Sequence, residues 1–204
     1  MPRTGCSAAT AMPCACKRSL PPCKGCWMSS PSSEPSRRLF LALWPDATLR
    51  AQLAGLAAEA AGARQIAAAD LHLTLVFLGA TPPARRADYE AALADLPALE
   101  LELCLDRYGY WPRTGILWLG PQHTPAALLE RVALLHQRLA NCGFIPERRP
   151  FQAHVTLARR WPGPAPQPAP SRALCWPVRD LVLVESLPQP HGTRYRVLRR
   201  WPRD

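Results

Sequence analysis

Two four-residue segments of this chain match each other, and they constrain its fold more than any other feature. They are His72-Leu73-Thr74-Leu75 and His154-Val155-Thr156-Leu157, and each lies in a short apolar run typical of a β-strand. A strand-like segment and then a helical segment precede each run, so the same β-α-β pattern occurs in both halves of the chain. We therefore predict an α+β fold with internal duplication, with sheets inside and helices outside.

Hydrophobic periodicity and turn residues predict the remaining elements, in the order β-α-β-α-β-β-α-β-β-β. Asp46 is the expected N-cap of the first helix and Thr124 that of the third, which Gly143 should end. Proline at every second position of a later segment predicts an extended loop at 161–171. The expected strands span 37–44, 71–79, 99–106, 116–119, 151–158, 178–185 and 195–198, the expected helices span 46–62, 81–96 and 124–143, and a turn is expected at 110–115.

Residues 1–36 differ in composition from the rest of the chain. They are rich in Ser, Pro and Cys, and they show neither helical nor strand periodicity. We expect a disordered extension here, followed by a single domain at 37–204. Cys23-Lys24-Gly25-Cys26 has the spacing of half a zinc site, but no second pair completes it, which makes zinc an unfavoured alternative.

The balance of charge and apolar residues limits the partners of this protein. A formal net charge of +10 favours binding to a polyanionic partner such as nucleic acid, although an Arg-rich composition alone can produce this charge. No apolar run approaches the roughly 18–20 residues that span a bilayer, and no secretory signal follows the N-terminus. We therefore expect a cytoplasmic protein without a membrane partner, whose Cys104, Cys142 and Cys175 are reduced core residues.

The spacing within each matching segment places a histidine and a threonine on one face of a strand. Side chains at i and i+2 share a face, so His72 lies beside Thr74 and His154 beside Thr156. If the two strands are neighbours, one surface carries two imidazoles and two hydroxyls. One imidazole can deprotonate a water molecule while the other protonates a leaving oxygen, and the hydroxyls can bind phosphate oxygens. This chemistry needs no metal or other cofactor, and the set would make a poor metal site.

A structural explanation competes with this functional one. A single histidine in a strand is usually a hydrogen-bonded or surface residue, and one His-x-Thr segment carries little weight. Two copies 82 residues apart in similar contexts are much harder to attribute to chance. His123, His136 and His191 lack such a context, and we interpret them as structural or surface residues.

These segments and their surroundings resemble the 2H phosphoesterase superfamily, and within it the bacterial RNA 2′,3′-cyclic phosphodiesterase family, also called 2′-5′ RNA ligase. The resemblance rests on the two His-x-Thr-x segments, on Arg38-Leu39-Phe40-Leu41-Ala42-Leu43, on Leu75-Val76-Phe77-Leu78-Gly79 and on the run from Arg149 to Arg159. It covers roughly residues 37–200. One departure is Ala153, where the family often has proline before the second histidine.

The resemblance implies two pseudo-symmetric β-α lobes with antiparallel sheets lining a central cleft. It implies hydrolysis of a 2′,3′-cyclic phosphate at an RNA end to a 2′-phosphate, without a metal. His72 would protonate the 3′ oxygen and His154 would activate water, while Thr74 and Thr156 would hold the phosphate oxygens. Arg159 is a candidate phosphate ligand, although at i+5 from His154 it starts on the opposite strand face unless the strand bends.

Aromatic and basic residues outside the motifs are candidate RNA contacts. Trp111, in the expected turn, could expose its ring as a platform for a base. Phe77 could do the same, but core packing is the favoured interpretation because large apolar strand residues are mostly buried. Four arginines could contact RNA phosphates or form a solvated edge: Arg37, Arg38, Arg148 and Arg149.

Three functions remain open from the sequence. The first is a monomeric, metal-independent hydrolase of RNA 2′,3′-cyclic phosphate ends. The second keeps the site but acts on small cyclic nucleotides or 2′-5′ linkages. The third is a non-catalytic RNA-binding protein, which would not require both histidines.

Overall fold

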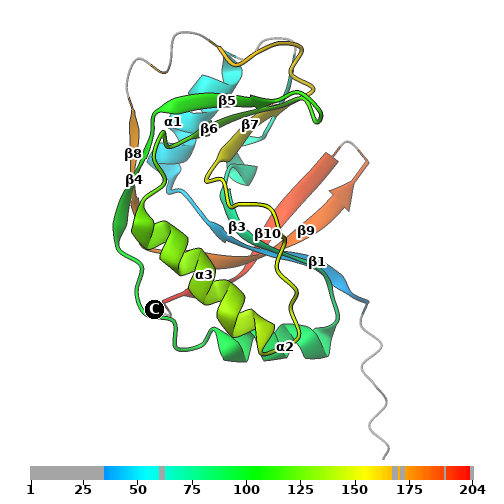
Figure 1. The fold of residues 1–204 in the computed structure, drawn as a ribbon. Helices are drawn as coiled ribbons and strands as arrows, with labels where there is room; N and C mark the ends of the chain where they lie inside the picture. The colour runs from blue at the N-terminus through cyan, green and yellow to red at the C-terminus, as the bar shows by residue number, and fades with distance from the viewer. Residues whose placement is uncertain (1–34, 60–62, 167–169, 171–172, 191, 203–204) are drawn as a thin grey trace, which may run out of the picture. The chain divides into compact units, whose positions relative to one another are not determined.

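The computed structural model describes residues 35–59, 63–166, 170, 173–190 and 192–202. Antiparallel strands form the centre of the molecule and α-helices lie outside them, which confirms the predicted α+β class (Figure 1). The helices are α1 (Ala47–Ala58), α2 (Pro83–Ala92) and α3 (Ala126–Ala140), with a short 3-10 turn at Ala68–Asp70. The strands are β1 (Arg37–Leu43), β2 (Arg64–Gln65), β3 (Leu73–Thr81), β4 (Leu101–Leu105), β5 (Arg107–Trp111), β6 (Ile116–Gly120), β7 (Val155–Arg159), β8 (Leu174–Val178), β9 (Leu181–Gln189) and β10 (Gly192–Trp201).

The main sheet has the strand order β10-β9-β1-β3-β7-β6-β5, with β2 paired to β7, while β4 and β8 form a separate two-stranded sheet. β1 lies inside the main sheet because its apolar run is buried on both faces, with every residue from 39 to 43 at most 1% exposed. It pairs with β3 on one side and β9 on the other.

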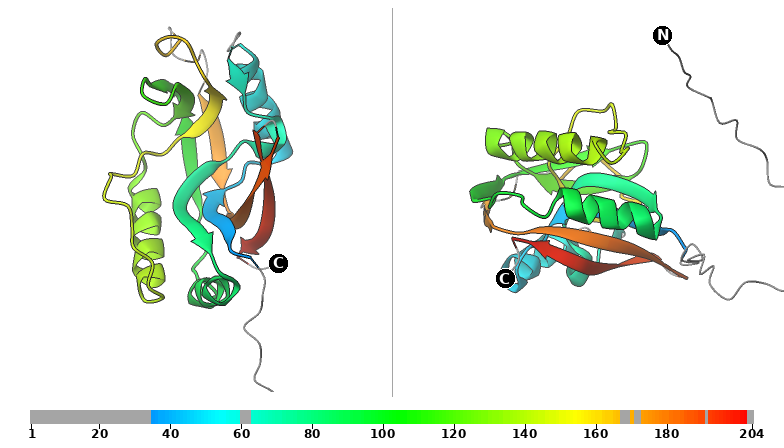
Figure 2. Two further views of the ribbon diagram at one scale, coloured as in Figure 1. Left: turned by 90° about the vertical axis from the view of Figure 1, so that its right-hand side faces the viewer. Right: turned by 90° about the horizontal axis from the view of Figure 1, so that it is seen from below.

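The two halves of the main sheet meet at β3 and β7. One residue pair joins these strands, Leu73 with Val155, and both side chains are fully buried. On either side of this junction β1 pairs with β3 and β6 pairs with β7, which gives the sheet the expected pseudo-symmetric arrangement. Helices also connect the two halves, because α1 from the first half contacts β7 and α3 from the second half contacts β3. Two views show α2 and α3 next to each other on one side of the molecule (Figures 1 and 2).

Local signals explain where α1 begins and where α3 ends. The Asp46 carboxylate accepts a hydrogen bond from the Leu49 amide at 2.8 Å, as expected for the N-cap of α1. The N-cap of α3 is Pro125, without a side-chain hydrogen bond, so the expected Thr124 cap is wrong. Gly143 follows α3 at φ +77°, a left-handed conformation that stops the helix as predicted.

Several predicted boundaries were wrong. The expected turn at 110–115 begins too early, because β5 continues to Trp111 and only the following four residues form the turn. The expected strand at 178–185 is the end of β8 and the start of β9, separated by Arg179 and Asp180. α2 ends at Ala92 rather than near residue 96. His72 and His154 each precede the first residue of their strand instead of lying within it.

The cysteines also differ from expectation. None of the three described cysteines is fully buried: Cys142 is half-buried and packs against the core, Cys104 is half-buried, and Cys175 is exposed. The predicted extension at 1–36, with its five cysteines, lies outside the described residues except for positions 35 and 36, which are exposed. Among the described residues, no helix has the length and apolar character needed to cross a membrane.

Candidate active site

The two histidines and two threonines of the matching segments gather at the junction of β3 and β7. The antiparallel pair of Leu73 and Val155 sets the register, which brings His72 opposite Thr156 and Thr74 opposite His154. Leu73 and Val155 point into the core, so the four polar side chains share the other face. All four line a cleft of about 1000 Å³, the central cleft.

Each imidazole is oriented by an equivalent hydrogen bond to a backbone carbonyl two residues earlier. His72 Nδ1 is 2.7 Å from the carbonyl oxygen of Asp70, and His154 Nδ1 is 2.8 Å from the carbonyl oxygen of Gln152. A carbonyl can only accept, so Nδ1 must carry the proton in the neutral rings. Nε2 is then the atom of each ring that can accept a proton or, once protonated, deliver one.

Asp70, whose backbone carbonyl orients the His72 ring, is itself held in place by residues of β10. Its side chain is buried and accepts hydrogen bonds from the Tyr195 amide at 3.2 Å and from Arg194 Nη1 at 3.1 Å. Because the Asp70 carbonyl holds the imidazole, these bonds tie the position of His72 to β10. A buried carboxylate needs such partners, since an unpaired buried charge is costly.

Aromatic rings surround both histidines. The Trp44 ring stacks on the His72 ring at 5.5 Å and 10°, and the Tyr195 ring meets it edge-on at 4.8 Å. On the other side, the Trp111 ring meets the His154 ring at 4.6 Å and 75°. Trp111 is half-buried and lines the cleft from the end of β5 rather than from a turn.

The aromatic surroundings and a nearby positive charge lower the pKa of both histidines. Desolvation is the largest cause for His72 and lowers its pKa to about 4; the Asp70 hydrogen bond opposes this, and His154 and Arg159 reinforce it. Desolvation also lowers the pKa of His154, with a further contribution from Arg159. Both rings are therefore neutral near pH 7.

Arg159 lines the central cleft although period-two alternation places it on the other face. The reason is a bulge in β7: Leu117 pairs with Ala158 and Trp118 with Thr156, so β7 has one extra residue between them. Leu157 and Ala158 are both buried, and the alternation then resumes with Arg159 exposed on the cleft side. Burial raises the pKa of Tyr195, and the positive charge of Arg159 opposes this.

Phe77 reaches the cleft in the same way, and its favoured assignment to the core was wrong. In β3 the register skips Leu75, since Leu41 pairs with Val76 and Ala42 with Thr74. Phe77 is 51% exposed, lines the central cleft and stacks on Phe40 at 5.7 Å.

The other basic candidates contribute less. Arg149 lines the cleft but pairs with Glu147 at 2.9 Å, and Arg37 pairs with Glu185 at 3.5 Å outside it. The histidines without a motif are spread out: His123 is exposed, His136 lines the cleft from α3, and His191 lies outside the described residues.

Sequence reasoning missed Tyr195, whose ring meets the His72 ring edge-on from β10 and which lines the central cleft. No motif surrounds this tyrosine, and only the pairing of β10 with β9 brings it to the cleft. A tyrosine in a strand gives no signal of such a role before the sheet order is known.

Comparison with known proteins gives consistent matches over most of the chain. Residues 44–189 match the model of the 2′-5′ RNA ligase superfamily. The chain is 31% identical over 172 residues to an RNA 2′,3′-cyclic phosphodiesterase of Escherichia coli, covering 83% of this chain and 97% of that relative. It is 32% identical over 177 residues to a protein of the same name from Thermus thermophilus, covering 80% of this chain and 89% of the relative.

Solved structures agree with this relationship. The fold matches Escherichia coli LigT complexed with 3′-AMP at a TM-score of 0.73 and 31% identity, over 82% of this chain and 98% of that one. A Thermus thermophilus protein matches at a TM-score of 0.68 and 30% identity, over 80% of this chain and 96% of that one.

Proposed function

Because this chain belongs to the 2′-5′ RNA ligase superfamily, we propose that it hydrolyses 2′,3′-cyclic phosphate ends of RNA to 2′-phosphates. The observation that carries the proposal is the crossed arrangement of His72 with Thr156 and of Thr74 with His154 on one face of the central cleft. Two imidazoles held by equivalent backbone hydrogen bonds suit a reaction that takes one proton and gives one.

The cyclic phosphate lies between the two histidines in this mechanism. The Nε2 atom of His154 takes a proton from water, whose oxygen forms a new bond to phosphorus. The bond from phosphorus to the 3′ oxygen breaks, and the imidazolium of His72 donates its Nε2 proton to that oxygen. Thr74 and Thr156 donate hydrogen bonds to the non-bridging oxygens, where negative charge concentrates in the transition state.

The assignment of His72 as the acid and His154 as the base follows the family resemblance. His72 must be protonated to act as the acid, and a bound phosphate anion favours the charged form. Desolvation lowers the His72 pKa, and the Asp70 carboxylate opposes this because its charge favours an imidazolium. Among the described residues, no carboxylate raises the pKa of His154 in this way.

The rest of the cleft suits the end of an RNA strand. Arg159 is the proposed phosphate ligand, and Trp111 and the exposed Phe77 ring are proposed surfaces for bases. A cleft of about 1000 Å³ is at the upper end of ligand-pocket volumes, which favours a longer substrate over a small cyclic nucleotide. Both histidines come from one chain, so we propose that residues 37–204 act as a monomer.

The test uses purified full-length protein and an oligonucleotide ending in a 2′,3′-cyclic phosphate, with EDTA present. We expect a 2′-phosphate product, and a loss of at least about 100-fold in kcat for His72→Ala and for His154→Ala. His123→Ala is the matched control, because His123 is exposed and does not line the cleft. Unchanged turnover in either cleft variant would contradict the mechanism. Salt-sensitive RNA binding without product would instead identify a binding protein.

A further inference from the structure

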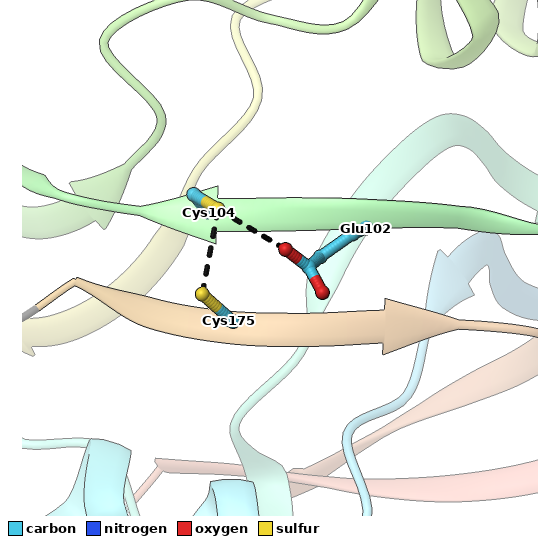
Figure 3. A group of neighbouring side chains, drawn as sticks. All are labelled: Glu102, Cys104 and Cys175. Atoms are coloured by element: carbon cyan, nitrogen blue, oxygen red, sulfur yellow. Dashed lines mark hydrogen bonds between the residues drawn. The ribbon is translucent and has the colours of Figure 1, made fainter.

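Cys104 and Cys175 face each other on the two-stranded sheet of β4 and β8, apart from the central cleft. They are direct cross-strand partners, and their sulfur atoms are 3.5 Å apart (Figure 3). Glu102, two residues before Cys104, projects from the same face of β4, and its Oε1 lies 3.9 Å from Cys104 Sγ. Within the described part of the chain this is the only group of three potential metal ligands whose donor atoms all lie within 4.8 Å of one another.

We propose that Glu102, Cys104 and Cys175 form a binding site for a thiophilic divalent cation of the zinc class, with water completing the coordination. Two thiolates on one tetrahedral zinc, with bonds of about 2.3 Å, place their sulfur atoms about 3.8 Å apart. The observed 3.5 Å needs a change of only a few tenths of an ångström. The side chains are exposed or half-buried, so a cation can reach them from solvent.

The charge of the group also favours a cation. The Glu102 carboxylate oxygen lies 3.9 Å from Cys104 Sγ, so a thiolate at Cys104 would place two negative charges side by side. A divalent cation reverses this interaction, because it stabilises the thiolates and the carboxylate together. Two sulfur donors select zinc-like ions over magnesium and calcium, which prefer oxygen ligands.

A disulfide is the competing use of the same pair. It would require an oxidant and a further approach of the two sulfurs to about 2.05 Å. A disulfide has no need of Glu102, whereas a metal site uses its carboxylate. Substitution of Glu102 therefore separates the two interpretations.

A cation bound at this site would stabilise the half of the central cleft that contains His154. The chain between Cys104 and Cys175 contains β5, β6, α3 and β7, and therefore Trp111 and His154. A cation that joins β4 to β8 closes this long loop, which lowers the entropy of the unfolded chain. Neither β4 nor β8 lines the central cleft, so this proposal does not rest on the proposed function.

The experiment uses the full chain, reduced, with Cys6, Cys14, Cys16, Cys23 and Cys26 replaced by serine. Titration with Co²⁺ should give one equivalent of binding and a near-ultraviolet thiolate charge-transfer band, and Zn²⁺ should displace the Co²⁺. We expect Cys104→Ser and Cys175→Ser to weaken binding at least tenfold and to weaken the band. Glu102→Gln should weaken binding severalfold and keep the band. Cys142→Ser, the matched control, should change nothing.

Thermal unfolding provides an independent measurement on the same proteins. Saturating Zn²⁺ should raise the Tm of the background protein by several degrees, and this shift should disappear in Cys175→Ser. Equal Co²⁺ affinity in Cys175→Ser and Cys142→Ser would overturn the proposal. So would a fully reduced background protein that takes up no Co²⁺, which would leave the pair as a redox pair.

Discussion

Phe77 and Arg159 occupy equivalent positions in the two halves of the central cleft. Each lies five residues after a motif histidine, and each follows a bulge that buries two consecutive residues. The bulge returns the next side chain to the cleft, so one duplicated backbone feature presents an aromatic ring from β3 and a guanidinium from β7. We infer that Phe77 in the first half provides a stacking surface for a base, and that Arg159 in the second half binds a phosphate.

Replacement of Phe77 by alanine should weaken substrate binding while leaving the chemical step almost intact. The ring is 51% exposed, so its removal costs little folding stability. Stacking of a base on such a ring is worth about 1–3 kcal/mol, which predicts a KM roughly 5- to 150-fold higher with a nearly unchanged kcat. Steady-state kinetics with a cyclic-phosphate oligonucleotide measures the two constants separately.

Phe77→Tyr is the control for this prediction, because it keeps a ring that can stack. It should retain a KM close to that of the wild type. A tyrosine variant as weak as the alanine variant would show that Phe77 does not act as a stacking surface.

Replacement of Arg159 by glutamine should affect both substrate binding and the histidines. The loss of a charged phosphate ligand should lower kcat/KM by about 10- to 100-fold, on the basis of roughly 1.5–3 kcal/mol for a hydrogen bond to a charged group. Arg159 also lowers the pKa of both histidines, so its removal should raise these pKa values. The acidic limb of the pH profile of kcat/KM should therefore move to higher pH.

That shift distinguishes an electrostatic role from a structural one. Arg149→Gln is the matched control, since Arg149 also lines the cleft but is paired with Glu147 and contributes to neither histidine pKa. It should leave the acidic limb in place. An unmoved limb in Arg159→Gln would contradict the role assigned to the charge.

The two bulges also show where prediction from sequence stops. Residue types and period-two spacing correctly paired each histidine with its threonine, and strict alternation then placed position i+5 on the wrong face. A bulge has no signature in one apolar run, because Leu75-Val76 and Leu157-Ala158 look like ordinary strand residues. It becomes visible only when the partner strands β1 and β6 are known.

Two of the strands that prediction missed have a comparable explanation. β8 contains Pro177, which argues against a central strand, and it is tolerated because β8 pairs with β4 alone. β5 contains Gly109, which lies against the Trp118 ring of β6; a Cβ at that position would come within 1.9 Å of the ring. Each residue is explained by its partner strand, β4 for Pro177 and β6 for Gly109, and periodicity within one segment cannot reveal such contacts.

Acidification should destabilise the protein through His72. Its pKa is about 4 in the folded protein and near 6.5 when unfolded, so between these values the unfolded chain binds the extra proton. The contribution of His72 to the free energy of unfolding is therefore largest above about pH 6.5. It falls as the pH is lowered toward 4, by up to about 3 kcal/mol. Urea unfolding at pH 7 and at pH 5 measures the loss.

His72→Gln provides the comparison, because glutamine does not titrate. The difference in unfolding free energy between pH 7 and pH 5 should be smaller in this variant than in the wild type. Equal pH dependence in the two proteins would show that His72 is not held neutral by its surroundings.

The assignment of His72 as the acid can be tested by changing the leaving atom. A substrate with sulfur in place of the 3′ oxygen has a leaving group that departs without a proton, so it does not need a general acid. We expect His72→Ala to recover most of its lost rate on this substrate, because its missing function is no longer required. His154→Ala should remain at least about 100-fold impaired, since water must still be deprotonated. Single-turnover rates of the wild type and both variants on oxygen and sulfur substrates measure this directly. Recovery of His154→Ala in place of His72→Ala would exchange the two roles, and recovery of neither would show that no proton transfer to the leaving atom limits the reaction.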